Sequence, residues 1–338
     1  MYRKKIFLLL TLMLIMFLSG WAGGFQMDHY LGSECKGNYV WGGAMNLAWL
    51  ELNENILHEK LRLNTNDKVA LEMVDKLNRS PFTKNDLDEK SYYIKSGFGQ
   101  ETVDLINKES RQKFPGKSFQ DLELKMAPID IISYAYFLKE VEYWTQFEEK
   151  EVLFEKERVK GFYAKGHDQQ ENIRILKYWE DDRFIISLKL KDGGNELFLA
   201  KGFDINKPQG IINEIVRYHS TNLPLMGHDD QFEMPKLHLQ LHRDYIELIR
   251  KNLANKGFEK YFIASMFENI KFDMDHKGAK VENEAVIAAP TAMPSTQRPK
   301  VKRFILNKPF WVVMKRKDSR NPYFVLGVKN TELMEKIR

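Results

Sequence analysis

The chain has 338 residues with 43% hydrophobic and 12% aromatic side chains, and its 52 basic and 47 acidic residues leave a net charge of +5. This composition can bury a core, so it excludes a disordered chain. The longest basic run, residues 300–303, is too short to predict a nucleic-acid partner. Cys35 is the only cysteine, which excludes an intramolecular disulfide and leaves stability to the core.

The N-terminus has the pattern of a targeting segment. Basic residues at 3–5 precede an apolar stretch over 6–18, and Gly20 and Ala22 fit a small-x-small cleavage site. The apolar stretch is shorter than the roughly 20 residues that a membrane-spanning helix needs. We therefore predict a signal peptide at residues 1–22 and a secreted or periplasmic protein. The membrane would be a partner only if this segment stayed uncleaved.

Helical patterns follow in the first third of the chain. Residues 38–52 lead into a helix, because their apolar side chains recur at helical spacing. Residues 69–74 fit either a helix or a strand. Residues 100–111 are amphipathic and are followed by a Pro-Gly pair, which predicts a helix that ends there.

Strand patterns dominate the middle of the chain. The composition of residues 129–137 predicts a central strand. Two more strands are predicted at 173–178 and 184–190, with a turn at 192–195. Residues 209–218 predict a helix.

Residues 232–242 alternate strictly toward their end, with leucines on one face and His238 and His242 on the other. On a strand these two histidines lie ~13 Å apart, too far to share one ion. We therefore predict no metal site, and no motif indicates a cofactor. Residues 245–256 predict a helix ended by Gly257.

The last seventy residues carry the most informative order of elements. A strand pattern at 270–275 leads to Gly278, and a long stretch of small residues and prolines then reaches Arg303. Two apolar strand patterns, 304–314 and 323–328, close the chain. The side chains expected to be mostly buried there are Ile305, Phe310, Val312, Val313, Phe324 and Leu326.

This order resembles the serpin family over residues 38–57, 97–147 and 170–330. In serpins a strand ends at a hinge glycine, an exposed reactive loop follows, and two apolar strands return the chain to the core. The resemblance implies an α+β fold with a large mixed β-sheet and packed helices, in a single domain at residues 23–338. It also implies a long exposed reactive-type loop at about 286–303. Two regions are shorter than in the family, so the chain looks like a shortened, divergent serpin of bacterial type.

The resemblance implies a function as well. Serpins of the inhibitory kind are suicide inhibitors of serine or cysteine proteases, because the cleaved loop inserts into the protein's own sheet as a new strand. A non-inhibitory serpin-fold protein that binds a ligand or partner is the alternative. A secreted hydrolase is not supported, because the chain lacks Gly-x-Ser-x-Gly and His-Glu-x-x-His motifs. We therefore predict that the protein is not an enzyme.

The predicted hinge departs from the family's run of Gly-Thr-Glu and alanines. If the loop inserted from Gly278, alternate residues would face the core: Ala279, Val281, Asn283, Ala285 and Ile287. One buried, unpaired asparagine would cost ~1–3 kcal/mol. Four apolar side chains, at ~0.8 kcal/mol per buried CH₂, should outweigh that cost. Insertion is therefore thermodynamically possible. The free energies do not determine how fast the loop would insert, so an inhibitory and a non-inhibitory function both stay open.

The family also keeps serines, an asparagine and a histidine in a hydrogen-bonded shutter under the sheet. By position these residues become Gly42 or Gly43, Ser133 and Glu268 here.

Two ways of counting along the loop place the reactive bond differently. Counting from the hinge gives Ala292–Met293, and counting back from the returning strand gives Ser295–Thr296. Met293 cannot itself precede the cleaved bond, because a proline follows it. Small residues before either bond predict an elastase- or subtilisin-like protease as the partner. Arg298, which follows these bonds, is also followed by a proline. Trypsin should therefore leave the segment from Ala292 to Thr296 intact.

Overall fold

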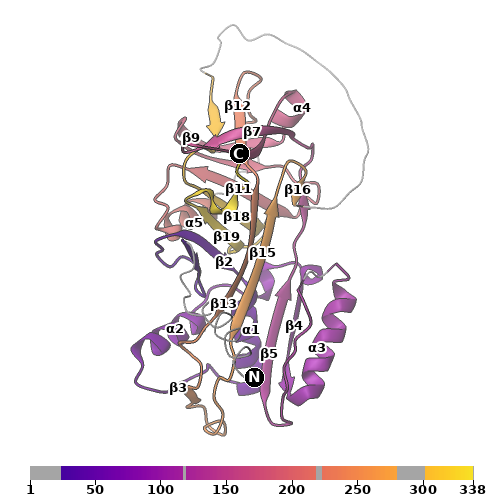
Figure 1. Cartoon of the computed structure of the whole chain (residues 1–338), viewed down its shortest axis with the longest axis vertical. Helices are drawn as coiled ribbons and strands as arrows, with labels where there is room; N and C mark the ends of the chain where they lie inside the picture. Colours follow the sequence, from indigo (N-terminus) through magenta and orange to yellow (C-terminus); the bar gives the residue numbers. More distant parts are fainter. Residues whose placement is uncertain (1–23, 117–118, 218–222, 280–300, 338) are drawn as a thin grey trace, which may run out of the picture.

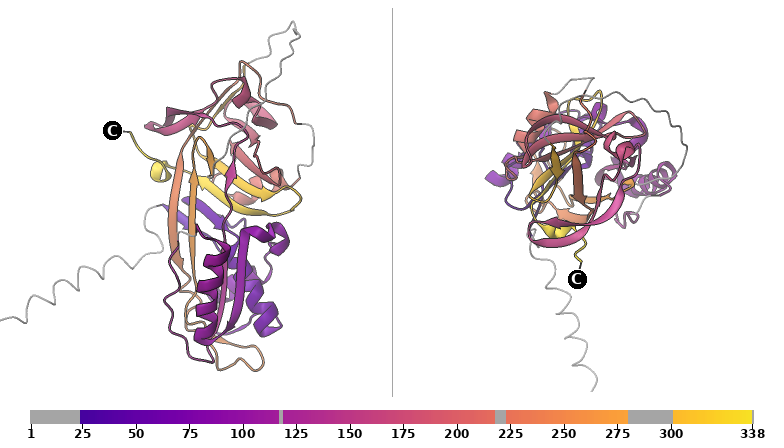
Figure 2. Two further views of the ribbon diagram at one scale, coloured as in Figure 1. Left: turned by 90° about the vertical axis from the view of Figure 1, so that its right-hand side faces the viewer. Right: turned by 90° about the horizontal axis from the view of Figure 1, so that it is seen from above.

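The computed structural model describes residues 24–116, 119–217, 223–279 and 301–337, with strand pairs that are covered by helices in its lower half (Figure 1). Two views at right angles show an elongated molecule with β13 and β15 along its length (Figure 2). The helices are α1 (Ala44–Glu51), α2 (Lys68–Asn78), α3 (Gly99–Lys113), α4 (His167–Gln170) and α5 (Pro208–Val216). Shorter helical segments are η1 (Leu52–Leu57), η2 (Lys84–Asp86), η3 (Glu89–Ser91) and η4 (Thr331–Leu333).

The largest sheet has seven strands in the order β1-β2-β19-β18-β11-β10-β9. It is mixed, because β1 pairs with β2 in parallel and the other pairs are antiparallel. Its near-continuous apolar runs suit strands covered on both faces, and β19 is buried over its whole length. The strands are β1 (Phe25–Met27), β2 (Asn38–Gly42), β9 (Ile173–Glu180), β10 (Arg183–Leu188), β11 (Asn195–Lys201), β18 (Phe310–Arg316) and β19 (Pro322–Val328).

A second sheet of four strands has the order β17-β12-β8-β7. It shares the main hydrophobic core with the seven-stranded sheet, and Phe304 packs with its ring centroid 5.3 Å from that of Phe184. The strands are β7 (Glu148–Phe154), β8 (Glu157–Tyr163), β12 (Gln231–Pro235) and β17 (Arg303–Ile305).

The remaining strands form separate pairs. Two pairs are long: β4 (Tyr92–Phe98) with β5 (Ile131–Phe137), and β13 (Leu237–Asp244) with β15 (Phe267–Met274). Two are short: β3 (Leu63–Asn64) with β14 (Asn252–Leu253), and β6 (Val141–Glu142) with β16 (Gly278–Ala279). Helix α3 covers the β4–β5 pair, burying Val103 and Ile106 against Ile132.

Most of the predicted elements are confirmed. The pattern at 100–111 is α3, that at 209–218 matches α5, and the two strands at 173–178 and 184–190 are β9 and β10. Among the side chains expected to be mostly buried near the C-terminus, five are buried and Ile305 is half-buried.

The ambiguous pattern at 69–74 lies in a helix, α2. The Asp67 side chain accepts hydrogen bonds from the amides of Val69 and Ala70 and so caps the first turn. The buried face recurs at helical spacing, with Ala70, Met73, Val74 and Leu77.

Three expectations are corrected. Residues 38–42 form the buried strand β2, and the helix begins only at Ala44. Residues 131–137 do form a strand, but β5 pairs with β4 and lies outside the seven-stranded sheet. It is only half-buried at most positions, because its other edge faces a groove.

The third correction is the helix predicted at 245–256, which does not form. The backbone amides there bond to distant carbonyl groups instead: Tyr245 N–H to Met266 and Leu253 N–H to Tyr261. Tyr245 and Leu248 are buried, whereas Ile246 is exposed. Long-range pairing therefore satisfies backbone groups that a helix would otherwise have paired locally.

The structure does not test two predicted segments. The signal peptide at 1–22, and the loop at 286–303 except for its last three residues, lie outside the described residues. Within the described residues no helix has the length and apolar content needed to cross a membrane.

Candidate functional site

A groove of about 1690 Å³ runs between β5 and β15. One wall contains the whole of β5, and the other contains the whole of β15. Among the described residues, β5 pairs along its length only with β4, and β15 only with β13. Each strand therefore presents one unpaired edge to the groove. Such edges bind an added strand through main-chain hydrogen bonds.

The floor of the groove is where the two strand pairs approach the seven-stranded sheet. Gly42 ends β2, and a Cβ atom there would lie 3.2 Å from Ile270 of β15 and 3.7 Å from Phe137 of β5. At Gly43 a Cβ atom would lie only 2.2 Å from the ring of Phe82. The Phe82 ring thus takes the volume that a side chain at position 43 would need.

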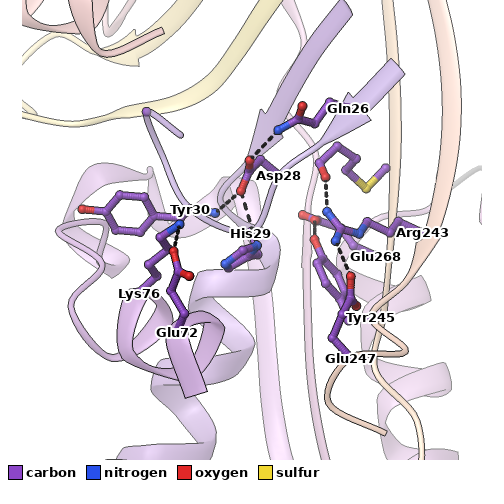
Figure 3. Close-up of polar contacts among 12 residues, drawn as sticks. Gln26, Asp28, His29, Tyr30, Glu72, Lys76, Arg243, Tyr245, Glu247 and Glu268 are labelled. Carbon is purple, nitrogen blue, oxygen red and sulfur yellow. Dashed lines mark hydrogen bonds and ion pairs between the residues drawn. The ribbon is translucent and has the colours of Figure 1, made fainter. Parts of the chain in front are cut away.

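Ser133 and Glu268 tie the two walls to the interior. The Ser133 hydroxyl donates to the carbonyl oxygen of Ala48 in α1, at 2.6 Å. The buried Glu268 carboxyl accepts a hydrogen bond of 2.8 Å from the hydroxyl of Tyr245, which directly follows β13 (Figure 3). Two of the positions expected to form a shutter, Ser133 and Glu268, therefore line the groove, and a third, Gly42, packs behind it against Ile270 and Phe137.

Burial raises the pKa of Glu268 to about 8. The Tyr245 hydroxyl, the Met45 amide and the Arg243 guanidinium act in the opposite direction but do not offset the loss of solvation. Glu268 is therefore largely uncharged at neutral pH, which a carboxyl at the floor of an apolar groove requires.

The upper end of the groove is bounded by Glu142, Lys277 and Gly278. The chain turns there after β15, and the Asp275 amide donates to the Gly278 carbonyl oxygen at 3.2 Å. Gly278 has a φ of 129°, and a Cβ atom there would lie 2.6 Å from the carbonyl oxygen of Val141. Only glycine fits this close approach of β16 to β6.

Of the predicted hinge, the structure places Gly278 and Ala279 in β16, beside the mouth of the groove. The other predicted functional residues lie outside the described residues: Val281, Asn283, Ala285, Ala292, Met293, Ser295 and Thr296. Their roles stay predictions. The chain is described again from Val301, and β17 joins the four-stranded sheet by pairing with β12.

Lys201 anchors the returning chain, a feature that the sequence analysis missed. Its ammonium group donates to the Ile305 carbonyl oxygen at 2.7 Å and to Asn307 at 2.8 Å, and it lies 2.8 Å from Asp182. Only 3% of this side chain is exposed. The sequence signal for this contact was a lysine at the end of the apolar run in β11. A lysine is rarely buried unless it is paired, so this position could have predicted a buried ion pair.

Replacing Lys201 by methionine is expected to lower the free energy of unfolding by about 2–3 kcal/mol, because buried oxygens lose their donor. Lys308 offers a matched control, since it also pairs with Asp182, at 2.6 Å, but is 55% exposed. Lys308→Met should cost less than about 1 kcal/mol. Urea unfolding of both variants checks this, and equal losses would contradict the anchoring role.

Comparison with known proteins identifies the fold. No family model and no curated protein matches the sequence. The structure of Serpin48, described as a highly specific serpin of the insect Tenebrio molitor, aligns over 88% of this chain and 92% of that chain, with a TM-score of 0.51 and 14% identity. The native structure of tengpin, a thermophilic serpin, aligns over 88% of this chain and 89% of that chain, with a TM-score of 0.52 and 15% identity.

These alignments span most of both chains. The two regions that are shorter here than in the family therefore leave the overall fold recognisable. The likeness concerns the three-dimensional fold, which is α+β with a large mixed sheet and packed helices. The chain therefore has a serpin fold.

Proposed function

We propose that the protein is a secreted or periplasmic protease inhibitor that traps its target by strand insertion. The observation that carries this proposal is the groove, whose two walls present unpaired strand edges and whose mouth adjoins β16. The segment that follows Ala279 in the sequence could supply the strand that fills the groove. No cofactor and no metal ion are part of this proposal.

The reaction would begin as ordinary proteolysis. The serine or cysteine of the target protease attacks the carbonyl carbon of the residue before the reactive bond. An ester or thioester forms, the peptide bond breaks, and the amine leaves as a new N-terminus. The freed segment then enters the groove and carries the attached protease with it. Inhibition results if entry is faster than hydrolysis of the acyl bond by water.

The register of β16 specifies how the inserted strand would lie. Gly278 and Ala279 pair antiparallel with Glu142 and Val141. If that register continued along β5, position 285 would lie beside Ala135. If the turn at Asp275 continued along β15, the same position would lie beside Glu268.

This register supports the alternation predicted from the sequence. Ser133 points from β5 toward α1, so Ala135 and Phe137 share its inward face. Positions 279, 281, 283, 285 and 287 would then face inward, which are the apolar positions of the hinge with one asparagine. A small residue, Ala285, would stand beside the Glu268 carboxyl.

The target is proposed to be an elastase- or subtilisin-like protease, because small residues precede both candidate bonds, Ala292–Met293 and Ser295–Thr296. The test incubates the protein with an elastase-like enzyme, a subtilisin-like enzyme and trypsin. We expect a first cut between Ala292 and Thr296 by the first two, an SDS-stable complex, and no cut in that window by trypsin. A first cut outside residues 288–303 would contradict both the proposed reactive bonds and the proposed role of the loop as the protease substrate.

A non-inhibitory binding protein is the second candidate, favoured by the charged side chains of the hinge. Lys280, Glu282 and Glu284 would have to pass close to α3, which covers the β4–β5 pair. Slow passage would let the protease hydrolyse the acyl bond first. Nicking in the loop without an SDS-stable complex would favour this second candidate.

A further inference from the structure

A polar cluster around the buried Glu268 links several elements of the fold (Figure 3). Its centre is Glu268 on β15, which lines the groove and is only 4% exposed. Among the described residues, Oε2 of this carboxyl is bonded to Tyr245, and Oε1 has no hydrogen-bond partner. The Met45 amide also favours the ionised form, but burial outweighs both this amide and the Tyr245 hydroxyl.

The charged and titratable groups that face Glu268 come from every element packed against it. Arg243 of β13 and Tyr245 after it approach from one side, Asp28 approaches from the segment after β1, and the Met45 amide belongs to α1. Arg243 is already engaged, since it donates to the Met27 carbonyl oxygen and pairs with Glu247 at 3.1 Å.

A second layer surrounds these groups. His29 lies 3.3 Å from Asp28, and Lys76 of α2 pairs with Glu72 at 2.9 Å. Burial lowers the pKa of His29, so this ring is favoured in its neutral form. Arg243 is the cation that acts on Glu268, and two of its five N–H donors are engaged by Met27 and Glu247. Its attraction lowers the pKa of Glu268 but does not offset the effect of burial.

We propose that Glu268 is a proton-controlled latch on the groove. With its proton, the carboxyl sits in the apolar floor and keeps β15 against α1. Without its proton, the carboxylate needs water for its unpartnered oxygen, and the groove that it lines is the adjoining space that can admit water. Hydration on that side loosens β15 and widens the groove, so a strand enters faster at alkaline pH. The effect on strand entry rests on the proposed function, whereas the latch itself does not.

The sign of the pH dependence follows from linkage. The folded state holds the Glu268 proton more tightly than the unfolded chain, because the pKa rises from 4.5 to about 8 on folding. The stability that the neutral carboxyl contributes is complete below pH 4.5 and is lost as the pH rises through 8. His29 acts in the opposite direction, since its lowered pKa destabilises the fold as the pH falls below 6.5. The two effects oppose each other between pH 4.5 and 6.5, and above pH 6.5 only the loss from Glu268 continues.

The first test measures the melting temperature of the uncleaved protein and of Glu268→Gln from pH 5 to pH 9. The amide resembles the protonated carboxyl but cannot ionise. We expect the two proteins to melt together near pH 5, and the variant to melt higher by at least about 5 °C at pH 9. Glu247→Gln is the matched control, because it removes a carboxylate from the same cluster, and it should keep the wild-type slope above pH 7. Parallel curves for wild type and Glu268→Gln would overturn the latch.

A measurement on the unaltered protein removes any dependence on how a variant folds. Infrared spectra at pH 6.5 should contain the band of a protonated carboxyl, since carboxyls of ordinary pKa are ionised there. That band should disappear as the pH rises past about 8, together with faster amide exchange in β15 than in β18. Absence of the band at pH 6.5 would also overturn the latch.

The last arm separates the latch from inhibition. Complex formation with an elastase-like protease should accelerate from pH 7 to pH 9 in wild type, relative to Glu268→Gln. If no complex forms at any pH while the melting and infrared results hold, the latch stands and the inhibitory function fails. If complexes form with no difference between the two proteins, the effect of the latch on strand entry is refuted.

Discussion

Cleavage of the chain within residues 288–303 is expected to raise the melting temperature by at least about 10 °C. An inserted strand would bury Val281 and Ile287, which contribute roughly 1.5–3 kcal/mol each when fully buried, and two alanines, which contribute roughly 0.8 kcal/mol each. It would also pair the two open edges of β5 and β15, which have no other partner along the groove among the described residues. For a chain of this length, each kcal/mol raises the melting temperature by about 2 °C. Melting curves of the intact and the nicked protein, followed by circular dichroism, measure this shift.

A nick elsewhere provides the control. A protease site engineered into residues 218–222 would cut the chain without freeing a strand beside the groove. That nick should leave the melting temperature unchanged or lower it. An equal rise after both cuts, or no rise after the cut at 288–303, would contradict strand insertion.

The replacement Ala285→Asp is expected to abolish the SDS-stable complex while leaving cleavage of the loop intact. In the proposed register this position faces inward beside Glu268 and Ala135. An aspartate there would have to lie next to the buried carboxyl of Glu268. The cost of burying such a charge is several kcal/mol, and each 1.4 kcal/mol is a factor of ten in an equilibrium. Gel electrophoresis of protease mixtures should therefore show at least a tenfold loss of complex, with cleaved protein in its place.

Ala288→Asp is the matched control, because the same chemical change is made at a position that faces outward in the inserted strand. It should change the yield of complex by no more than about twofold. If both variants behave alike, the register drawn from β16 is wrong. If Ala285→Asp still forms the complex, the strand does not enter the groove in the proposed way.

The elements with a strong local signal could be predicted from the sequence. The apolar runs of β18 and β19 indicate strands buried on both faces, and the spacing in α3 and α5 indicates helices that cover a sheet. The order of elements around Gly278 was enough to predict the fold class that the structural comparisons support. The apolar runs and the helical spacing each involve residues that are close in the sequence, so the sequence pattern is sufficient to predict these strands and helices.

The backbone at 38–42 and 245–256 was decided by tertiary contacts. Gly42 and its neighbours pair with β19, more than 280 residues away, and the amide of Tyr245 finds its acceptor at Met266. A local pattern of apolar spacing cannot report such partners. Long-range hydrogen bonds therefore make 38–42 a strand and override the helical pattern at 245–256.

The site itself combines both kinds of information. The positions Gly42, Ser133 and Glu268 were identified from their order in the chain; Ser133 and Glu268 line one groove, and Gly42 packs against Ile270 and Phe137, which also line it. The open edges of β5 and β15, the buried Lys201 and the raised pKa of Glu268 appear only in three dimensions. Each of them depends on which groups surround a polar atom after folding, because desolvation and hydrogen bonding are set by neighbours that are distant in the sequence.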